Sequence, residues 1–278
     1  METKIQMIKT KTSPAIAVSI LEDEKNTKRP IVFGHGAAMG SWDFEEYFMN
    51  YFFKKGYNVY ALNWRGYGES ELAEGQDYNE VTLADCVQDL RNVVEMVKKR
   101  TGKDPIIAGH SQGGAVTQMY MKEYEVETAV LIGMADFANF MPPVIKFFLE
   151  RFPEGKKRVD AEDFGWFSDD KAFIRAFMFG DETNPKMELW AEKMAKQGAA
   201  AATVNDVMTK YKVGDAKGNP KVFIVTGSVD PAATPESVES GVKAYNADNL
   251  VIEGMYHGVP TSKDWKIAAD AIIDWLEK

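Results

Sequence analysis

The 278-residue sequence has a single cysteine and only three histidines. Cys86 cannot form an internal disulfide, and no metal-ligand spacing surrounds it, so we expect neither a disulfide framework nor a metal site. Leu83, Val87 and Leu90 indicate a buried helix face around it, which places its thiol in the core. Because nothing in this pattern requires an oxidising compartment, we expect the protein to work in the cytoplasm.

Long apolar runs and an excess of positive charge are absent as well. No apolar run is long enough to cross a bilayer, and the first eleven residues are polar with mixed charge, so we expect no membrane span and no secretory signal. The chain has 33 basic and 42 acidic residues, a net charge of −9. Its longest basic cluster is Lys156–Lys157–Arg158, so we expect no nucleic-acid partner. The oligomeric state stays open.

The chain length and a hydrophobic content of 45% suit one large α/β domain. Strand patterns alternate with helical patterns, which predicts a mostly parallel sheet because parallel strands need crossover connections. Asp43 is predicted to cap a helix that ends at Lys55, Thr82 to cap one that ends at Lys99, and 264–278 to form the last helix. The predicted strands are 4–10, 15–21, 30–33, 57–63, 105–108, 128–134, 222–226 and 249–252.

One span interrupts this alternation. Between Met134 and Lys221 there is no convincing strand pattern, but helical patterns occur at 143–152, 169–179, 185–195 and 203–210. A loop of this length would be unusual, so we predict a helical cap inserted between two core strands. The predicted domains are a core formed by 1–135 and 211–278 and a cap formed by 136–210.

The segment 105–114, PIIAGHSQGG, contains the motif around which the chain is organised. Apolar residues lead into a Gly-x-Ser-x-Gly sequence, and apolar residues at helical spacing follow it. A strand that turns sharply into a helix would place Ser111 at the apex, with its hydroxyl above the sheet at the helix N-terminus. Glycine at 109 and 113 is expected because such a strained turn leaves no room for Cβ atoms. Ser111 is therefore the predicted nucleophile.

A serine hydroxyl needs a base near neutral pH, and the base needs an orienting acid. His35 lies in a strand-to-loop turn, and His110 precedes Ser111, where strand geometry points its side chain away from the serine. His257 lies between glycines in a loop after the last predicted strand. His257 is therefore the predicted base.

Two aspartates compete for the role of the acid. Asp230 follows the strand at 222–226, and the order Ser111, Asp230, His257 matches a known chain order of nucleophile, acid and base. Asp136 follows the preceding strand and would lie at the same sheet edge. We favour Asp230 as the acid. If Asp136 is not the acid, we expect it to act as a capping or hydrogen-bonding residue at the hinge of the inserted helical segment.

Negative charge that develops on a substrate carbonyl needs donors that are already aimed at it. The backbone N–H of Gln112, directly after the nucleophile, is one predicted donor. Ala37 follows His35–Gly36 in the loop after the third strand, and its N–H is the other.

The predicted cap is rich in phenylalanine, tryptophan and methionine. Such a composition predicts an apolar pocket for an acyl chain or an aromatic ester, although most of these side chains are expected to pack the cap onto the core. Phe137, Phe140 and Met141 lie closest to the strand edge and are the predicted substrate contacts.

Taken together, these segments resemble the α/β-hydrolase fold superfamily, in particular esterase- and lipase-like serine hydrolases with a helical cap. The resemblance rests on His35–Gly36, on WRGYGES at 64–70, on GHSQGG at 109–114, on GSVD at 227–230 and on His257–Gly258. It implies an eight-stranded sheet whose first strands are antiparallel, a cap after the sixth strand, and a pocket between cap and sheet edge. It also implies a structural ion pair for Arg65.

The same resemblance limits the chemistry. Dehalogenase and epoxide hydrolase members carry aspartate at the elbow, the sharp turn between strand and helix where this chain has Ser111. The serine therefore disfavours both activities. We expect a cofactor-free serine hydrolase that cleaves small to medium apolar carboxylic esters through an acyl-enzyme. The alternatives on the same triad are a carbon–carbon bond hydrolase, a lactonase, a thioesterase and a hydroxynitrile lyase, and a non-hydrolytic binding protein also stays open.

Overall fold

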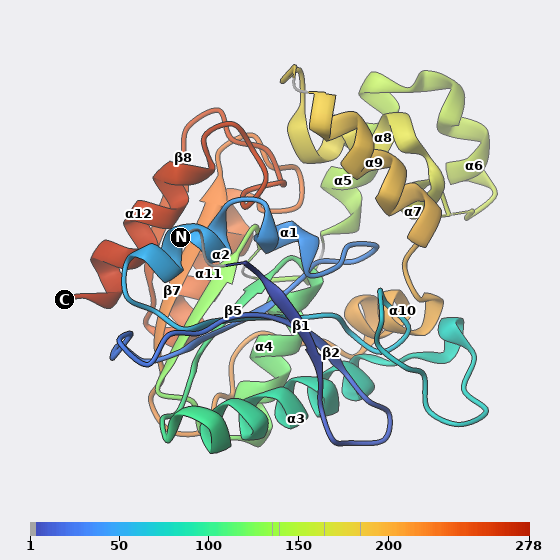
Figure 1. Cartoon of the computed structure of the whole chain (residues 1–278). Helices are drawn as coiled ribbons and strands as arrows, with labels where there is room; N and C mark the ends of the chain where they lie inside the picture. Colours follow the sequence, from blue (N-terminus) through green and yellow to red (C-terminus); the bar gives the residue numbers. More distant parts are fainter. Residues whose placement is uncertain (1–3, 135, 139, 164, 184) are drawn as a thin grey trace.

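A computed structural model of the chain describes residues 4–134, 136–138, 140–163, 165–183 and 185–278, and its centre is one sheet of eight strands (Figure 1). The strand order is β1-β2-β4-β3-β5-β6-β7-β8. β1 and β4 each pair antiparallel with β2, and the other neighbours are parallel. The strands are β1 (Gln6–Lys9), β2 (Ala17–Leu21), β3 (Ile31–Gly34), β4 (Val59–Leu62), β5 (Ile106–His110), β6 (Thr128–Ile132), β7 (Lys221–Gly227) and β8 (Asp248–Ile252). This sheet confirms the predicted fold class and the antiparallel start.

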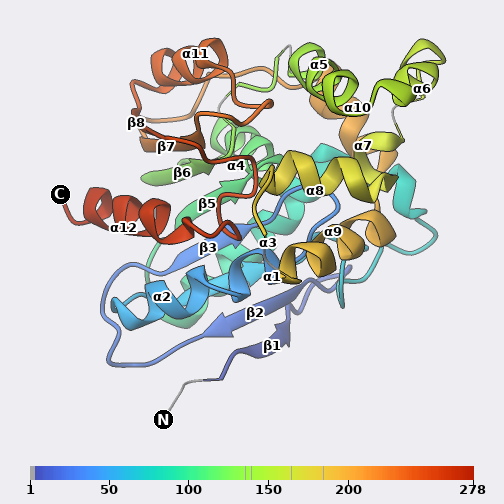
Figure 2. The same cartoon turned by 90° about the horizontal axis from the view of Figure 1, so that it is seen from above.

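Helices cover both faces of the sheet because the central strands are apolar on both sides. Val32 of β3 lies in the core cluster that includes α3 (Leu83–Thr101) and α4 (Gln112–Glu123). Phe33 lies in the opposite cluster, with α2 (Phe48–Lys54) and α12 (Trp265–Leu276). Figure 2 looks onto the face of the sheet, with α2 and α12 in front of it and α3 behind it. Cys86 is fully buried in the first cluster, as predicted.

The helix predicted from Asp43 to Lys55 is divided in two, α1 (Trp42–Glu45) and α2. The prediction that Asp43 is the N-cap is wrong, because Ser41 occupies that position and the buried Asp43 carboxylate is hydrogen-bonded to the His110 ring. Thr82 caps α3 as expected, accepting from the backbone N–H of Asp85. The sequence reading missed α11 (Pro235–Tyr245), although Thr234 before Pro235 is a recognised helix start.

Between β6 and β7, the described residues contain helices and no strand. Most of these helices lie together at the upper right of Figure 1, and the last of them lies lower and contacts α3. The predicted helical patterns of this span are therefore present. The shortest two, α6 and α7, have no counterpart among the predicted segments. The set is α5 (Met141–Arg151), α6 (Lys156–Asp160), α7 (Trp166–Asp169), α8 (Lys171–Phe179), α9 (Pro185–Gln197) and α10 (Ala201–Thr209). The division at residues 135 and 210 into core and cap stays a prediction.

Aromatic side chains hold the inserted helices to each other. The ring of Phe148 on α5 stacks on Trp166 of α7, with centroids 4.0 Å apart. Phe173 of α8 meets both rings edge-on, at 5.4 Å from Phe148 and 4.8 Å from Trp166. Stacked and edge-on pairs add to the free energy gained by apolar burial. These three side chains therefore pack the inserted helices against one another.

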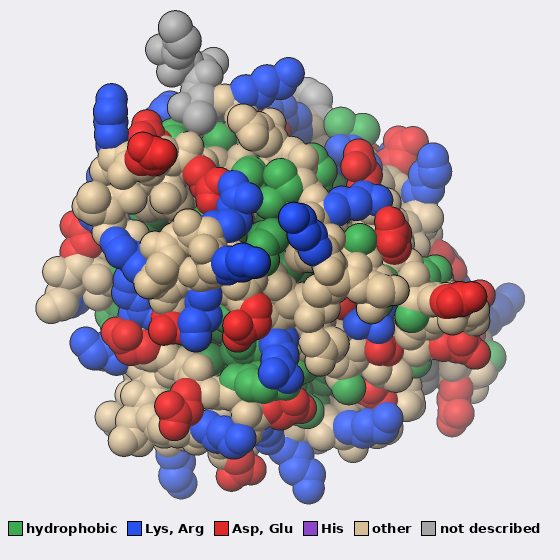
Figure 3. Space-filling model, turned by 60° about the horizontal axis from the view of Figure 1, so that its bottom comes forward, with side chains coloured by type: hydrophobic (Ala, Val, Ile, Leu, Met, Phe, Trp, Pro, Cys, Tyr) green, Lys and Arg blue, Asp and Glu red, His purple; other side chains and the backbone are tan. Residues whose placement is uncertain are grey.

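Among the described residues, no helix has the length and apolarity that a bilayer crossing requires. The same residues contain no group of three or more histidine, cysteine or acidic side chains placed to hold a metal ion. On the face seen in Figure 3, acidic and basic side chains are interspersed.

Candidate functional site

Ser111 lies at the sharp turn between β5 and α4, with φ 51° and ψ −119°. Its N–H donates to the Ile132 carbonyl on β6 at 2.9 Å, and its own carbonyl accepts from Gly114 N–H at 2.7 Å. A Cβ on Gly109 would lie 2.1 Å from the Gly113 oxygen, and one on Gly113 would lie 2.1 Å from the Gly34 oxygen. The turn therefore needs glycine at both positions, for the steric reason the sequence suggested.

The structure brings Ser111, His257 and Asp230 into one hydrogen-bonded chain. His257 Nε2 is 2.9 Å from Ser111 Oγ, and His257 Nδ1 is 2.8 Å from Asp230 Oδ2. The other Asp230 oxygen, Oδ1, accepts from the backbone N–H of Ala232 at 2.8 Å, which fixes the carboxylate in its loop after β7. Because the Asp230 and His257 side chains are 0% and 2% exposed, little water competes for these bonds. A carboxylate on Nδ1 leaves Nε2 free to accept the serine proton.

Asp136, the rival acid, is engaged elsewhere. Its Oδ1 accepts from Ala138 N–H at 2.8 Å, and its Oδ2 accepts from the Ser240 hydroxyl at 2.6 Å. Ser240 belongs to α11, so Asp136 ties the start of the inserted segment to the core. This is the hinge role that the sequence reading left as its alternative.

The other two histidines have separate surroundings. His35 is fully buried, with Nδ1 2.8 Å from the Gly36 carbonyl and Nε2 accepting from Trp64 N–H at 3.3 Å. His110 lies against Asp43 and the His257 backbone, with its ring 5.2 Å from the His257 ring. It is therefore nearer to the predicted base than its place before Ser111 suggested.

Burial of His35 predicts a loss of stability at acidic pH. Burial lowers the pKa of His35 to about 4, against an opposing effect of its hydrogen bond to Gly36. A histidine in the unfolded chain titrates near pH 6.5, so the unfolded state binds more protons in this window and stability falls as the pH drops from about 6.5 to about 4. We expect about 3 kcal/mol from this residue. Urea unfolding of wild type and His35→Gln across this range checks it, and equal pH slopes would contradict it.

The predicted oxyanion donors lie beside the nucleophile. Gln112 is the first residue of α4, where backbone N–H groups have no acceptor within the helix. Ala37 lines the same small cavity as Ser111. The loop that holds it passes close by, since a Cβ on Gly36 would lie 3.1 Å from Ser111 Cβ. Both backbone groups are therefore placed near the position that a substrate carbonyl would occupy.

Two small cavities, here called the first and second lobes, lie beside Ser111. Both are lined by Ala37, Ser111, Phe177 and His257. The first lobe, of about 40 Å³, is further lined by Gln112, Met134, Phe137, Phe140, Val204, Val207 and Ala232. The second lobe, of about 20 Å³, is further lined by Ala38, Met39, Ile174, Met178, Met194 and Ala199. The walls are almost entirely apolar.

Two of the three predicted substrate contacts, Phe137 and Phe140, line the first lobe. Met141 begins α5, packs against the core and lines neither lobe. Sequence reasoning missed Phe177, whose ring lies 4.5 Å from the His257 ring and forms a wall of both lobes. Its only sequence signal was membership in the aromatic-rich segment, which many packing residues share.

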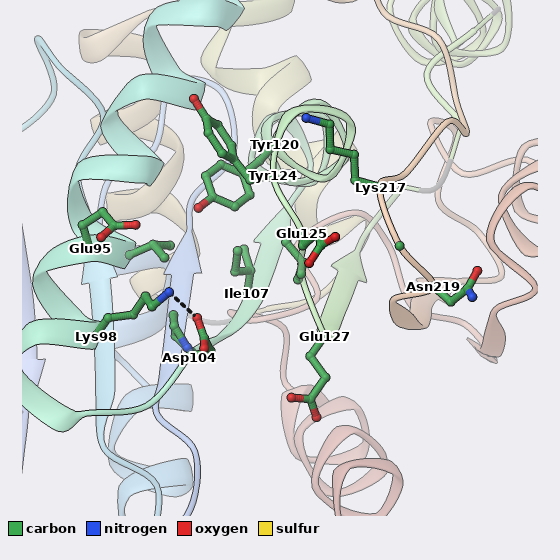
Figure 4. Close-up of a pocket in the computed structure, with 14 residues that line it drawn as sticks. Glu95, Lys98, Asp104, Ile107, Tyr120, Tyr124, Glu125, Glu127, Lys217 and Asn219 are labelled. Carbon is green, nitrogen blue, oxygen red and sulfur yellow. Dashed lines mark ion pairs between the residues drawn. The ribbon is translucent and has the colours of Figure 1, made fainter.

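A larger hollow, of about 560 Å³, lies at the other end of β5 (Figure 4). It includes Ile107 near the start of that strand, whereas Ser111 follows its end. Charged residues of both signs line it, and Lys98 and Asp104 form an ion pair of 2.8 Å within it. Ser111 is not among the residues that line this hollow, so the size of the hollow does not make it the reaction site.

Arg65 forms buried ion pairs with α3. Its Nη1 is 2.6 Å from Asp85 Oδ1, and its Nη2 is 2.7 Å from Asp89 Oδ1. Burial opposes the charge of Arg65, but the hydrogen bonds and charges of the two aspartates raise its pKa. The residue holds the loop after β4 to the helix, which is the structural ion-pair role that the resemblance implied.

Comparison with known proteins gives three kinds of match. The model of a family described as serine aminopeptidase, S33, matches residues 25–264. AB hydrolase superfamily protein YisY of Bacillus subtilis (strain 168) is 27% identical over 197 residues, 68% of either chain. A non-heme chloroperoxidase from Burkholderia pyrrocinia is 30% identical over 154 residues, 55% of this chain and 50% of that protein. The solved esterase EaEST from Exiguobacterium antarcticum has a TM-score of 0.71 at 17% identity, covering 98% of this chain and 99% of its own, a likeness of fold alone.

Proposed function

Because this chain belongs to the serine aminopeptidase S33 family of α/β-hydrolases, we propose that it is a serine hydrolase that cleaves small, apolar carboxylic esters. The observation that carries the proposal is the hydrogen-bonded chain from Ser111 through His257 to Asp230, which lies at the junction of two apolar lobes. An ester has two sides, and one lobe can receive each of them.

The geometry supports an acyl-enzyme mechanism. Ser111 Oγ attacks the ester carbonyl while its proton passes to His257 Nε2, and Asp230 stabilises the imidazolium that forms. The N–H groups of Ala37 and Gln112 stabilise the oxyanion, and the alcohol leaves with the proton from His257. Water, deprotonated by His257, then attacks the carbonyl of the acyl-serine, and Ser111 Oγ leaves with that proton from His257 as the acid is released.

The lobes also favour a class of substrate. Among the described residues, no lysine, arginine, aspartate or glutamate lines either lobe. A charged substrate would lose its hydration there without gaining a partner, so a neutral substrate is favoured. In particular, none of the described residues that line the lobes offers a carboxylate to the α-amino group of an aminopeptidase substrate. Volumes of about 40 and 20 Å³ favour short acyl and alcohol groups.

A fluorophosphonate label combined with an ester panel tests the proposal. The probe should modify Ser111, identified by mass spectrometry of the labelled peptide, and p-nitrophenyl esters should be hydrolysed with a preference for short acyl chains. If the wild-type protein neither reacts with the probe nor hydrolyses any activated ester, the proposed function is wrong. Binding of a ligand without turnover would favour a receptor role instead.

Widening the first lobe is expected to change chain-length preference. Phe140 is 9% exposed and lines this lobe, so Phe140→Ala creates space for additional methylene groups. Each buried methylene contributes about 0.8 kcal/mol, so burial of about two more methylene groups should raise the ratio of kcat/KM for hexanoate over acetate esters about tenfold. Met141→Ala is the matched control because Met141 lines neither lobe. An equal shift in both variants would contradict the assignment.

The chloroperoxidase relative supports a second candidate activity, formation of a peracid at the same serine. Hydrogen peroxide would replace water, attacking the acyl-serine through one oxygen and releasing the peracid and free Ser111. Peracid formation from an ester in the presence of peroxide, lost in Ser111→Ala, would support this activity. Hydrolysis unaffected by peroxide would count against it.

Two further expectations belong with this function. We propose a cytoplasmic location, supported by the single buried cysteine, and a small-molecule partner, supported by the size of the lobes. The mechanism requires no metal or organic cofactor, because the nucleophile, base and acid are all protein side chains.

A further inference from the structure

His110 lies between an acidic side chain and the backbone of the proposed base. Its side chain is fully buried. Nδ1 is 2.7 Å from Asp43 Oδ2 on α1, and Nε2 is 2.9 Å from the backbone oxygen of His257. The ring therefore connects α1, the end of β5 and the loop after β8 that presents His257.

These two contacts determine where the protons of His110 lie. A backbone carbonyl can only accept, so Nε2 carries a hydrogen. Nδ1 faces Asp43 Oδ2, and a hydrogen on Nδ1 that donates to this oxygen would make the ring an imidazolium. Burial alone would lower the pKa of His110, but the charge of Asp43, the hydrogen bond to it and the bond to His257 raise it. The pairing of opposite charges limits the cost of burying them.

We propose that His110, paired with Asp43, is a positioning residue. It holds the backbone of His257 so that Nε2 of His257 stays within hydrogen-bond reach of Ser111 Oγ. This inference rests on the proposed function of the triad. His110 does not touch the reacting atoms; it acts through the carbonyl of His257.

Backbone hydrogen bonds also hold the loop after β8, among them Gly258 N–H to the Met178 carbonyl at 2.8 Å. The His257 carbonyl also accepts from Val259 N–H at 2.8 Å. The backbone N–H of His257 donates to the backbone carbonyl of Phe177 on α8 at 3.4 Å. His110 supplies the contact from the core side. A Cβ on Gly133 would lie 2.9 Å from His110 Cδ2 and 3.5 Å from His257 Cε1, so glycine here leaves space for both rings.

The charge of the pair also matters to the base. The groups that face His110 are Asp43, His257, Asp230 and His35. An unpaired cation 5.2 Å from the His257 ring would oppose the positive charge that this ring gains during catalysis. Asp43 cancels that charge, so His110 can hold the loop without making His257 a weaker base.

Three substitutions separate this role from a general structural one. His110→Asn removes the donor to His257 and is expected to lower kcat about ten- to a hundredfold with KM within about twofold, because a displaced base misaligns the reaction. Asp43→Ala should lower kcat at least about tenfold, since the ring loses the partner that fixes its protons. Asp43→Asn should restore kcat to within about fivefold of wild type, because the amide can donate to Nδ1 while Nε2 still donates to His257.

The kinetic outcomes are decisive only for a folded protein, which circular dichroism and urea unfolding establish for each variant. A folded His110→Asn with kcat within twofold of wild type would overturn the proposal. So would an Asp43→Asn variant as impaired as Asp43→Ala, since rescue by the amide is what distinguishes positioning from loss of packing.

Nuclear magnetic resonance of wild-type protein with ¹⁵N-labelled histidine tests the arrangement without relying on activity. The chain has only three histidines, so few ring signals have to be assigned in spectra recorded at pH 8. Nε2 of His110 should carry a proton that it donates to the His257 carbonyl, whereas Nε2 of His35, which accepts from Trp64 N–H, should carry none. A His110 ring without a proton on Nε2 would overturn the proposal, because it could not donate to the His257 carbonyl. If wild type is neither labelled by fluorophosphonate nor active, the proposed function fails, and these spectra still report on the His110–Asp43 pair.

Discussion

Replacing Ser111 with alanine is expected to lower kcat for ester hydrolysis by about a million-fold, the scale of losing a triad nucleophile. The substitution removes the oxygen that lies 2.9 Å from His257 Nε2 and leaves no atom to form the acyl-enzyme. The residual rate should come only from substrate binding and the backbone donors. Turnover of a short-chain p-nitrophenyl ester, measured on wild type and on Ser111→Ala, checks the result.

The aspartates offer a matched control for the same experiment. Asp230→Asn should lower kcat by about ten-thousand-fold, because an amide at Nδ1 favours the wrong tautomer of His257. Asp136→Asn should leave kcat within a few-fold, since its carboxylate bonds to Ala138 and Ser240 rather than to a histidine. Comparable losses in the two variants would contradict the assignment of Asp230, and an active Ser111→Ala would refute the mechanism.

Gly109→Ala is expected to destabilise the fold by at least about 3 kcal/mol. The added Cβ would lie 2.1 Å from the Gly113 oxygen, 2.3 Å from its carbonyl carbon and 2.6 Å from the Gly114 nitrogen. All three are backbone atoms, which cannot rotate away as a flexible side chain can. The turn would have to open, which would also displace Ser111. Urea unfolding measures the stability loss, and fluorophosphonate labelling reports the displaced serine.

Gly114→Ala is the control for this prediction because it adds the same methyl group five residues away. There the nearest atom would be the Gly109 oxygen at 3.4 Å, an ordinary contact, and the position lies within α4. Alanine is favoured over glycine inside a helix by about 1 kcal/mol, so this variant should match or exceed wild-type stability. If both variants lose the same stability, the close approach at Gly109 is not the cause.

Local patterns accounted for the parts of the molecule that local interactions specify. The apolar run before Ser111, the paired glycines and the helical spacing after it predicted the strand, the turn and the helix, because each depends on neighbours within a few residues. The alternation of strands and helices predicted the parallel sheet for the same reason. Asp43 shows the limit of such reasoning, since a residue suited to a helix cap is instead bonded to His110 on another element.

The sequence by itself determined the elbow, the order of Ser111, Asp230 and His257, and the kind of sheet that carries them. Only the tertiary structure decided that Asp230 rather than Asp136 bonds to His257, that His110 supports the same loop, and that Phe177 rather than Met141 forms the walls of the lobes. Each of these depends on contacts between segments far apart in the chain. Short-range periodicity specifies the elements, whereas the packing of those elements decides which side chains meet.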